Sequence, residues 1–84
     1  MYEYEKEKPT LFTDEGQRTF LKIRDHVQKT LKAAGAIRME EAMDAASGSN
    51  WTRLACVDRL VELGEIREIP QHSVAGQHRI FTNN

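Results

Sequence analysis

Three histidines and one cysteine are the side chains of this sequence best suited to binding a metal or acting as nucleophiles. His26 falls within a helical pattern, whereas His72 and His78 flank a polar loop, and no cysteine pair lies near them. Because a zinc site needs three or four converging ligands, we expect no bound metal and no other cofactor. No neighbour of Cys56 obviously lowers the pKa of its thiol, so we interpret it as an unreactive cysteine.

The sequence contains no motif of a known catalytic site. It has no nucleophile paired with a base, no glycine-rich phosphate loop and no His-Glu-x-x-His pattern. Its 84 residues allow one domain with a small core. We therefore predict a protein that is not an enzyme and has no catalytic residue.

The location of the protein is predicted from features that the sequence lacks. It has no apolar run of about 20 residues, the length that a membrane span needs. Its N-terminus has neither the apolar region nor the small-residue cleavage site of a secretory signal. One cysteine cannot form an internal disulfide, which fits a reducing compartment. These features favour a cytoplasmic protein that does not contact a membrane.

The formal net charge is −1, which argues against a nonspecific nucleic-acid binder because such proteins carry excess lysine and arginine. The charge is nevertheless uneven. Residues 14–34 carry five basic and three acidic side chains, whereas residues 40–64 carry two basic and five acidic ones. A specific binder needs only a local cationic face, so DNA binding stays open, and so does a protein partner.

The elements that position these side chains follow from the apolar spacing. Residues 1–12 are rich in Glu and Lys and are predicted to be a charged, flexible N-terminal tail. A domain over residues 13–84 then begins with a helix that Thr13 or Asp14 caps and Gly35 ends. Its apolar stripe has helical spacing: Phe20, Ile23, Val27, Leu31 and Ala34.

A short strand is expected at 36–39, then a helix at 40–46, a turn at 47–50 and a helix at 51–63. In the last helix two sets of residues are separated by their spacing. The apolar set is predicted to face the core: Leu54, Val57, Leu60 and Val61. The opposite set is predicted to face solvent: Thr52, Ala55, Cys56 and Arg59.

The chain ends in a predicted β-hairpin, with strands at 66–69 and 77–82 and a polar loop at 71–76. The fold class is therefore α+β, with three helices and a small antiparallel sheet in the order α-β-α-α-β-β. The pattern resembles the winged helix-turn-helix superfamily. Two stretches carry the resemblance: AIRMEEAMDAASGSNWTRLACVDRLVELGEIREI and the closing GQHRIFT.

The resemblance implies a sequence-specific DNA-binding protein, a small transcriptional regulator that inserts helix 50–63 into the major groove and uses residues 66–82 as a wing. The implied partner is double-stranded DNA. By position, the implied contacts are Asn50, Trp51, Thr52, Arg53, Arg59, His72, Gln77, His78 and Arg79. Among them, Arg53 is expected to reach base edges and Arg59 to contact phosphate. For Trp51, a ring half-buried against the core is the alternative interpretation.

A domain this small contacts little DNA alone, so a homodimer is expected, formed through the helix at 14–34 with Leu21 and through the N-terminal tail. The alternative function is a winged-helix module for protein–protein interaction or assembly that does not bind DNA. The acidic helix at 40–46 and the near-neutral charge favour this alternative.

Overall fold

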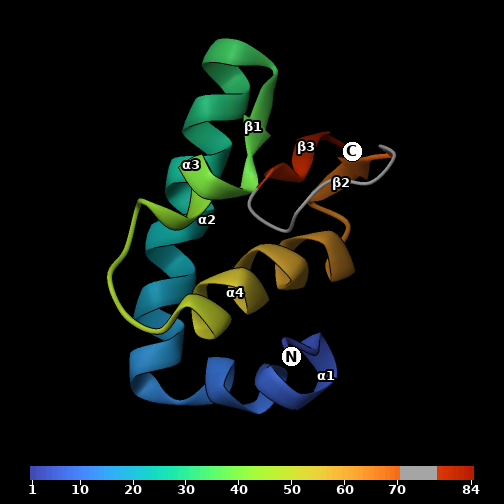
Figure 1. The fold of residues 1–84 in the computed structure, drawn as a ribbon. Coiled ribbons are helices and arrows are strands. Elements are labelled where there is room, and N and C mark those ends of the chain that lie inside the picture. The colour runs from blue at the N-terminus through green and yellow to red at the C-terminus, as the bar shows by residue number, and fades with distance from the viewer. Residues whose placement is uncertain (71–77) are drawn as a thin grey trace.

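The computed structural model describes residues 1–70 and 78–84. Its elements in chain order are α1 (Tyr4–Glu7), the 3₁₀ helix η1 (Lys8–Phe12), α2 (Asp14–Ala34), β1 (Ala36–Arg38), α3 (Met39–Met43), α4 (Asn50–Glu62), β2 (Ile66–Ile69) and β3 (Ile80–Asn83). The fold is α+β, with a small antiparallel sheet in the strand order β1-β3-β2 (Figure 1). The predicted class and the order of elements from residue 14 onward are confirmed.

Helix α2 begins and ends at the predicted residues. The Thr13 hydroxyl accepts a hydrogen bond from the Gly16 amide at 3.0 Å, which satisfies an amide that the helix itself leaves without a partner. At the other end Gly35 has a φ of 81°, a left-handed conformation that suits glycine. The predicted stripe is buried at Ile23, Val27 and Leu31, whereas Phe20 is only partly buried and Ala34, in the last turn, is exposed.

The central strand of the sheet is β3, which pairs with both of the other strands. Phe81 lies opposite Ile37 of β1 and Glu68 of β2, and its ring is fully buried. The observed strand β1 is one residue shorter than the predicted strand 36–39, because Met39 begins α3. The predicted strand 77–82 corresponds to β3, which begins only at Ile80. The predicted loop at 71–76 lies outside the described residues.

Helix α4 is rotated relative to the predicted orientation. Val57 and Leu60 are fully buried as expected, but so are Ala55 and Cys56, which were predicted to face solvent. The reason is that α4 contacts α1, η1, α2, α3 and β2. These elements together cover more of the helix surface than the single apolar stripe that was predicted. Two predicted core residues stay partly exposed: Leu54 and Val61.

The N-terminal residues correct a further prediction. Residues 1–12 do not form a featureless tail, because they fold into α1 and η1. Leu11 is 1% exposed, and the Gln17 side-chain amide donates to its carbonyl oxygen at 2.6 Å. One buried leucine therefore anchors a segment whose composition is dominated by charge.

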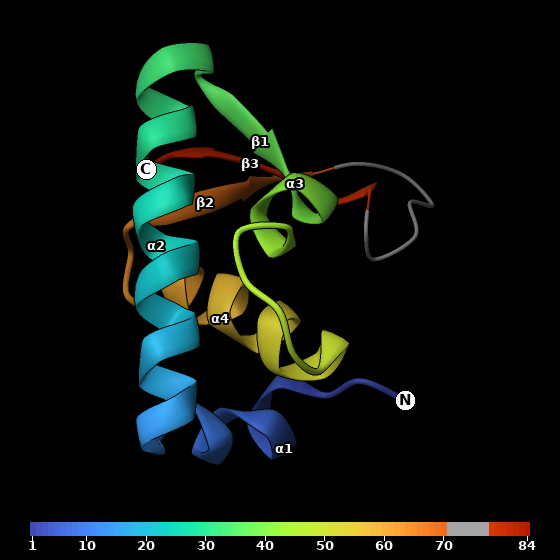
Figure 2. The same ribbon diagram turned by 90° about the vertical axis from the view of Figure 1, so that its left-hand side faces the viewer.

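Figures 1 and 2 show where this segment lies. Helix α1 is on the opposite side of α4 from the sheet, while α2 runs along one side of the whole domain (Figures 1 and 2). Both α1 and η1 contact α4. Helix α4 is thus packed between the sheet and the chain's own N-terminal segment.

Gly16 allows η1 to approach α2 closely. A Cβ at this position would lie 2.0 Å from the Thr10 carbonyl oxygen and 2.8 Å from the Leu11 Cα atom. We expect Gly16→Ala to lower the free energy of unfolding by about 1–3 kcal/mol, because backbone must shift to make room. Urea unfolding measures this. An increase in stability, as Ala usually gives within a helix, would contradict the close approach.

Candidate functional site

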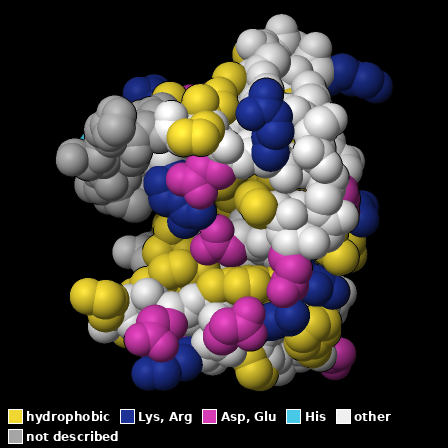
Figure 3. All heavy atoms as spheres, turned by 90° about the vertical axis from the view of Figure 1, so that its right-hand side faces the viewer, with side chains coloured by type: hydrophobic (Ala, Val, Ile, Leu, Met, Phe, Trp, Pro, Cys, Tyr) yellow, Lys and Arg dark blue, Asp and Glu magenta, His cyan; other side chains and the backbone are white. Residues whose placement is uncertain are grey.

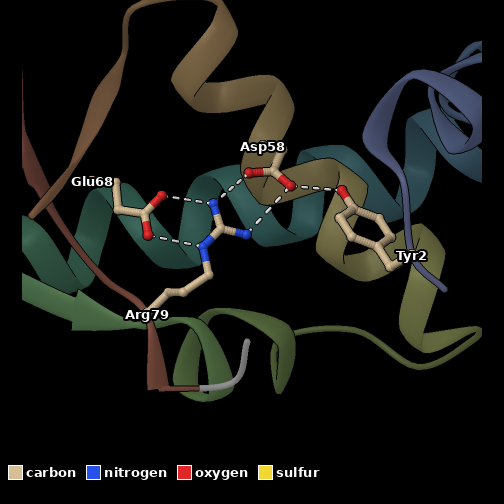
Figure 4. A network of polar contacts seen from close by, with 4 residues as sticks. All are labelled: Tyr2, Asp58, Glu68 and Arg79. Carbon is tan, nitrogen blue, oxygen red and sulfur yellow. Dashed lines mark hydrogen bonds and ion pairs between the residues drawn. The ribbon is translucent and has the colours of Figure 1, made fainter. Parts of the chain in front are cut away.

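Arg79, a predicted DNA contact, lies at the centre of a polar network (Figure 4). Its guanidinium donates to Glu68 of β2, with an Nη2–Oε1 distance of 2.8 Å, and to Asp58 of α4, with an Nη2–Oδ1 distance of 2.8 Å. The Tyr2 hydroxyl donates to the other oxygen of Asp58 at 2.6 Å. The hydrogen bonds to Glu68 and Asp58 raise the pKa of Arg79 above its usual value. Its charge is compensated within the protein, and it joins the start of β3 to α4 and β2.

A second cluster surrounds Glu62, one helical turn further along α4. Its carboxylate accepts hydrogen bonds from Lys8 at 2.9 Å, from Tyr4 at 2.7 Å and from Arg59 at 2.7 Å. These hydrogen bonds lower the pKa of Glu62 to about 2. Arg59 also lies over the Phe12 ring, 5.4 Å from its centroid. Arg59, predicted to contact phosphate, is therefore bound to a carboxylate of its own helix.

Arg53 has a structural role in the turn between α3 and α4. Its Nη1 donates to the carbonyl oxygens of Met43 at 3.2 Å and Ala46 at 3.3 Å. Its Nη2 donates to the Asn50 side-chain oxygen. These contacts satisfy carbonyl groups at the end of α3, where a cation is favoured. The predicted base contact is thus occupied in holding α4 against α3.

The first turn of α4 keeps other predicted residues accessible. Trp51 is 44% exposed, so more than half of its surface is covered, and Asn50 is exposed beside it. Thr52 is partly buried and His78 is exposed. Two predicted contacts, His72 and Gln77, lie outside the described residues. The structure therefore brings together Asn50, Trp51, Thr52 and Arg53, and separates them from Arg59 and Arg79.

The sequence interpretation missed a pair of cations beside this turn. Arg18 and Lys22 of α2 line a shallow pocket of about 210 Å³ with Ser47 and with one acidic residue, Glu15. An adjoining pocket of about 220 Å³ is rich in hydroxyl groups, among them those of Ser49 and Thr52. Arg18 and Lys22 form no ion pair with any residue that the structure describes. The excess of basic residues in 14–34 was visible in the sequence, but the sequence did not show that two of them lie next to the turn.

The structure also shows how the His, Cys, Asp and Glu side chains are distributed and where Cys56 lies. Within residues 1–70 and 78–84, no three His, Cys, Asp or Glu side chains come together as a metal would require. Cys56 is fully buried instead of solvent-facing, and burial raises the pKa of its thiol to about 12. None of the helices in these ranges has the length and apolarity needed to cross a membrane.

The described side chains form two kinds of polar surface, one around the α3–α4 turn and one where the N-terminal segment meets α4. The first has cations, hydroxyls and the carboxylate of Glu15, and the second has carboxylates among apolar side chains. No family model, curated protein or solved structure matches this chain.

The Arg79 network makes a prediction for stability. We expect Arg79→Gln to lower the free energy of unfolding by about 1.5–3 kcal/mol, because Asp58 and Glu68 lose charged hydrogen bonds. Arg67→Gln is the matched control: Arg67 is exposed on β2 and forms no ion pair with the residues in view. Equal unfolding midpoints for the two variants in urea would mean that the network contributes no stability.

The Glu62 cluster makes a prediction for pH. The native pKa of Glu62, about 2, lies below its ordinary value of 4.5, so the unfolded chain binds a proton first as pH falls. The contribution of Glu62 is complete above pH 4.5 and is lost as pH falls toward 2. We expect Glu62→Gln to weaken this acid dependence of the unfolding midpoint, and Glu5→Gln, in exposed α1, to preserve it. Identical pH profiles would contradict the assignment.

Proposed function

We propose that the chain is a winged helix-turn-helix domain, with α3 and α4 as the helix-turn-helix and β2 and β3 as the wing strands. Support comes from the succession α2-β1-α3-α4-β2-β3 and from the strand order β1-β3-β2, in which the last strand lies between the other two. The glycine-containing turn of residues 44–49 joins two helices in the way this motif requires.

The function that fits this geometry best is binding of double-stranded DNA, in the role of a small transcriptional regulator. One observation carries the proposal: Arg18 and Lys22 lie next to the turn that leads into the exposed first residues of α4. In helix-turn-helix proteins the N-terminal residues of the second helix contact base edges, while phosphates bind cations and helix N-termini nearby. Asn50, Trp51 and Thr52 would contact the bases, and the two α2 cations the backbone.

This mode of binding differs from the one that the resemblance implies. Arg59 and Arg79 hold carboxylates of the same chain, so they supply no free charge for phosphates. Few cations remain at the contact, and the affinity of a single domain is therefore low. A two-fold dimer on adjacent half-sites would double the contacts, and Leu21 on α2, 42% exposed, is available for such an interface.

A protein-interaction module is the second candidate, and a separate surface favours it. Phe12 and Leu63, 58% and 47% exposed, line a groove of about 300 Å³ between η1, α2 and the end of α4. Exposed large apolar side chains that gather in a groove are typical of protein contacts. The groove is at the opposite end of α4 from Asn50, so both functions are geometrically compatible.

Salt-dependent binding to duplex DNA tests the proposal. At salt concentrations between about 50 and about 200 mM, the slope of log affinity against log salt counts the phosphates contacted. We expect Arg18→Gln with Lys22→Gln to reduce this slope by about two units. Fluorescence anisotropy with a labelled duplex gives the affinities.

The control is Lys29→Gln with Lys32→Gln, which removes the same charge from exposed positions further along α2. We expect it to leave the slope nearly unchanged. An equal effect of both pairs would mean that only net charge matters, and the turn is then not the contact. Absence of salt-dependent binding by the unmodified protein would contradict DNA binding and leave the interaction module.

A further inference from the structure

Residues 1–8 lie against the outward face of α4 and are held there through the ends of long side chains. Tyr2 donates to Asp58, whereas Tyr4 and Lys8 both donate to Glu62. Helix α1 contains no buried residue, and no side chain caps its N-terminus. The attachment of this segment therefore depends on three polar contacts and on partial packing of the two tyrosine rings.

The next few residues are attached in a different way. Leu11 is buried in the core, Gln17 binds its carbonyl oxygen, and Gly16 lets the backbone at Thr10 approach α2. Side chains that are buried and closely packed separate only at a large cost in free energy. Residues 1–8 can thus leave α4 while residues 9–12 of η1 stay in place, with Pro9 at the boundary.

The α4 face beneath this segment combines apolar and anionic groups. Leu54 and Val61 are partly buried hydrophobic residues that pack against the core cluster, as do Tyr2 and Tyr4. The carboxylates of Asp58 and Glu62 come from the same helix. Figure 3 shows hydrophobic side chains with acidic and basic ones among them over the lower half of the molecule, where α1 and α4 lie.

We propose that residues 1–8 are an intramolecular lid, and that the α4 face beneath it is a docking site for a protein segment carrying aromatic hydroxyl groups and an ammonium group. The chemistry of the lid identifies this partner, because Asp58 and Glu62 accept hydrogen bonds from two tyrosines and one lysine. The two arginines beside these carboxylates are already paired with them, so this face supplies no free positive charge for phosphates and is unsuited to DNA. The proposal is independent of the DNA-binding function.

Competition between the lid and a partner sets the affinity that is measured. A segment tethered by a few residues has an effective concentration in the millimolar range. A partner must therefore displace the lid. Its apparent affinity equals the affinity for the open form multiplied by the fraction of molecules in which the lid is open. Variants that open the lid should bind the same partner more tightly.

Tyr2→Phe with Tyr4→Phe in the full chain tests the lid itself. The double variant keeps both rings and removes two hydroxyl donors to carboxylates, each of which is expected to change the lid equilibrium by about tenfold or more. Amide hydrogen exchange should then speed up over residues 2–8 and stay slow in α2 and α4. Glu5→Gln with Lys6→Gln, at exposed lid positions, is the control that should leave exchange unchanged.

The docking site is tested with a labelled synthetic peptide that has the sequence of residues 1–10. We expect it to bind the double Phe variant at least about tenfold more tightly than the unmodified protein. A peptide with Phe in place of both tyrosines should bind more weakly than the original peptide, by about a hundredfold. Fluorescence anisotropy without DNA keeps this result separate from DNA binding.

Two results would overturn the proposal. One is unchanged hydrogen exchange over residues 2–8 in the double Phe variant, and the other is equal peptide affinity for the variant and the unmodified protein. If the double variant unfolds, Lys8→Gln removes a single contact to Glu62 and serves in both measurements. It should give the same direction of change with a smaller magnitude.

Discussion

The burial of α4 is the constraint on which the rest of this structure depends. A chain of 84 residues buries a small core, so one central helix must pack against several neighbours at once. Ala55, Cys56, Val57 and Leu60 are all fully buried because α2, α3, β2 and the N-terminal segment each cover part of the helix. The polar side chains of α4 lie at the edges of these contacts, which explains why they pair with residues from the covering elements.

The charge pairs follow from this packing and change what a cation in this protein can do. Arg59 and Arg79 have the residue type that binds phosphate, but each lies beside a carboxylate that the fold holds in place. Their contribution is to stability and to the relative placement of strands and helices. Arg18 and Lys22 lie on α2 beside the α3–α4 turn, where nothing described pairs with them. What the basic side chains of this domain can bind therefore depends on whether a carboxylate of the same chain already pairs with them, more than on how many there are.

The sequence predicted the elements whose signals are local. The Thr13 cap, the left-handed Gly35 and the spacing of Ile23 and Val27 are all contained within one helix, so α2 was predictable. The rotation of α4 was not, because Leu54 looks as apolar as Leu60 until the covering elements are known. The partners of Arg79 lie 11 and 21 residues away, and only the tertiary structure brings them together. Residues 1–12 were likewise predicted to be a tail from their charged composition, because nothing in the sequence alone shows that Leu11 is buried.

The exposure of Trp51 has an optical consequence. It is the only tryptophan of the chain, and its indole ring is in contact with water in the folded state. Its emission therefore depends mainly on the surroundings of the first turn of α4, where the residue lies. The same emission responds directly to whatever covers the start of α4, so this protein carries a built-in reporter of ligands at that end of the helix.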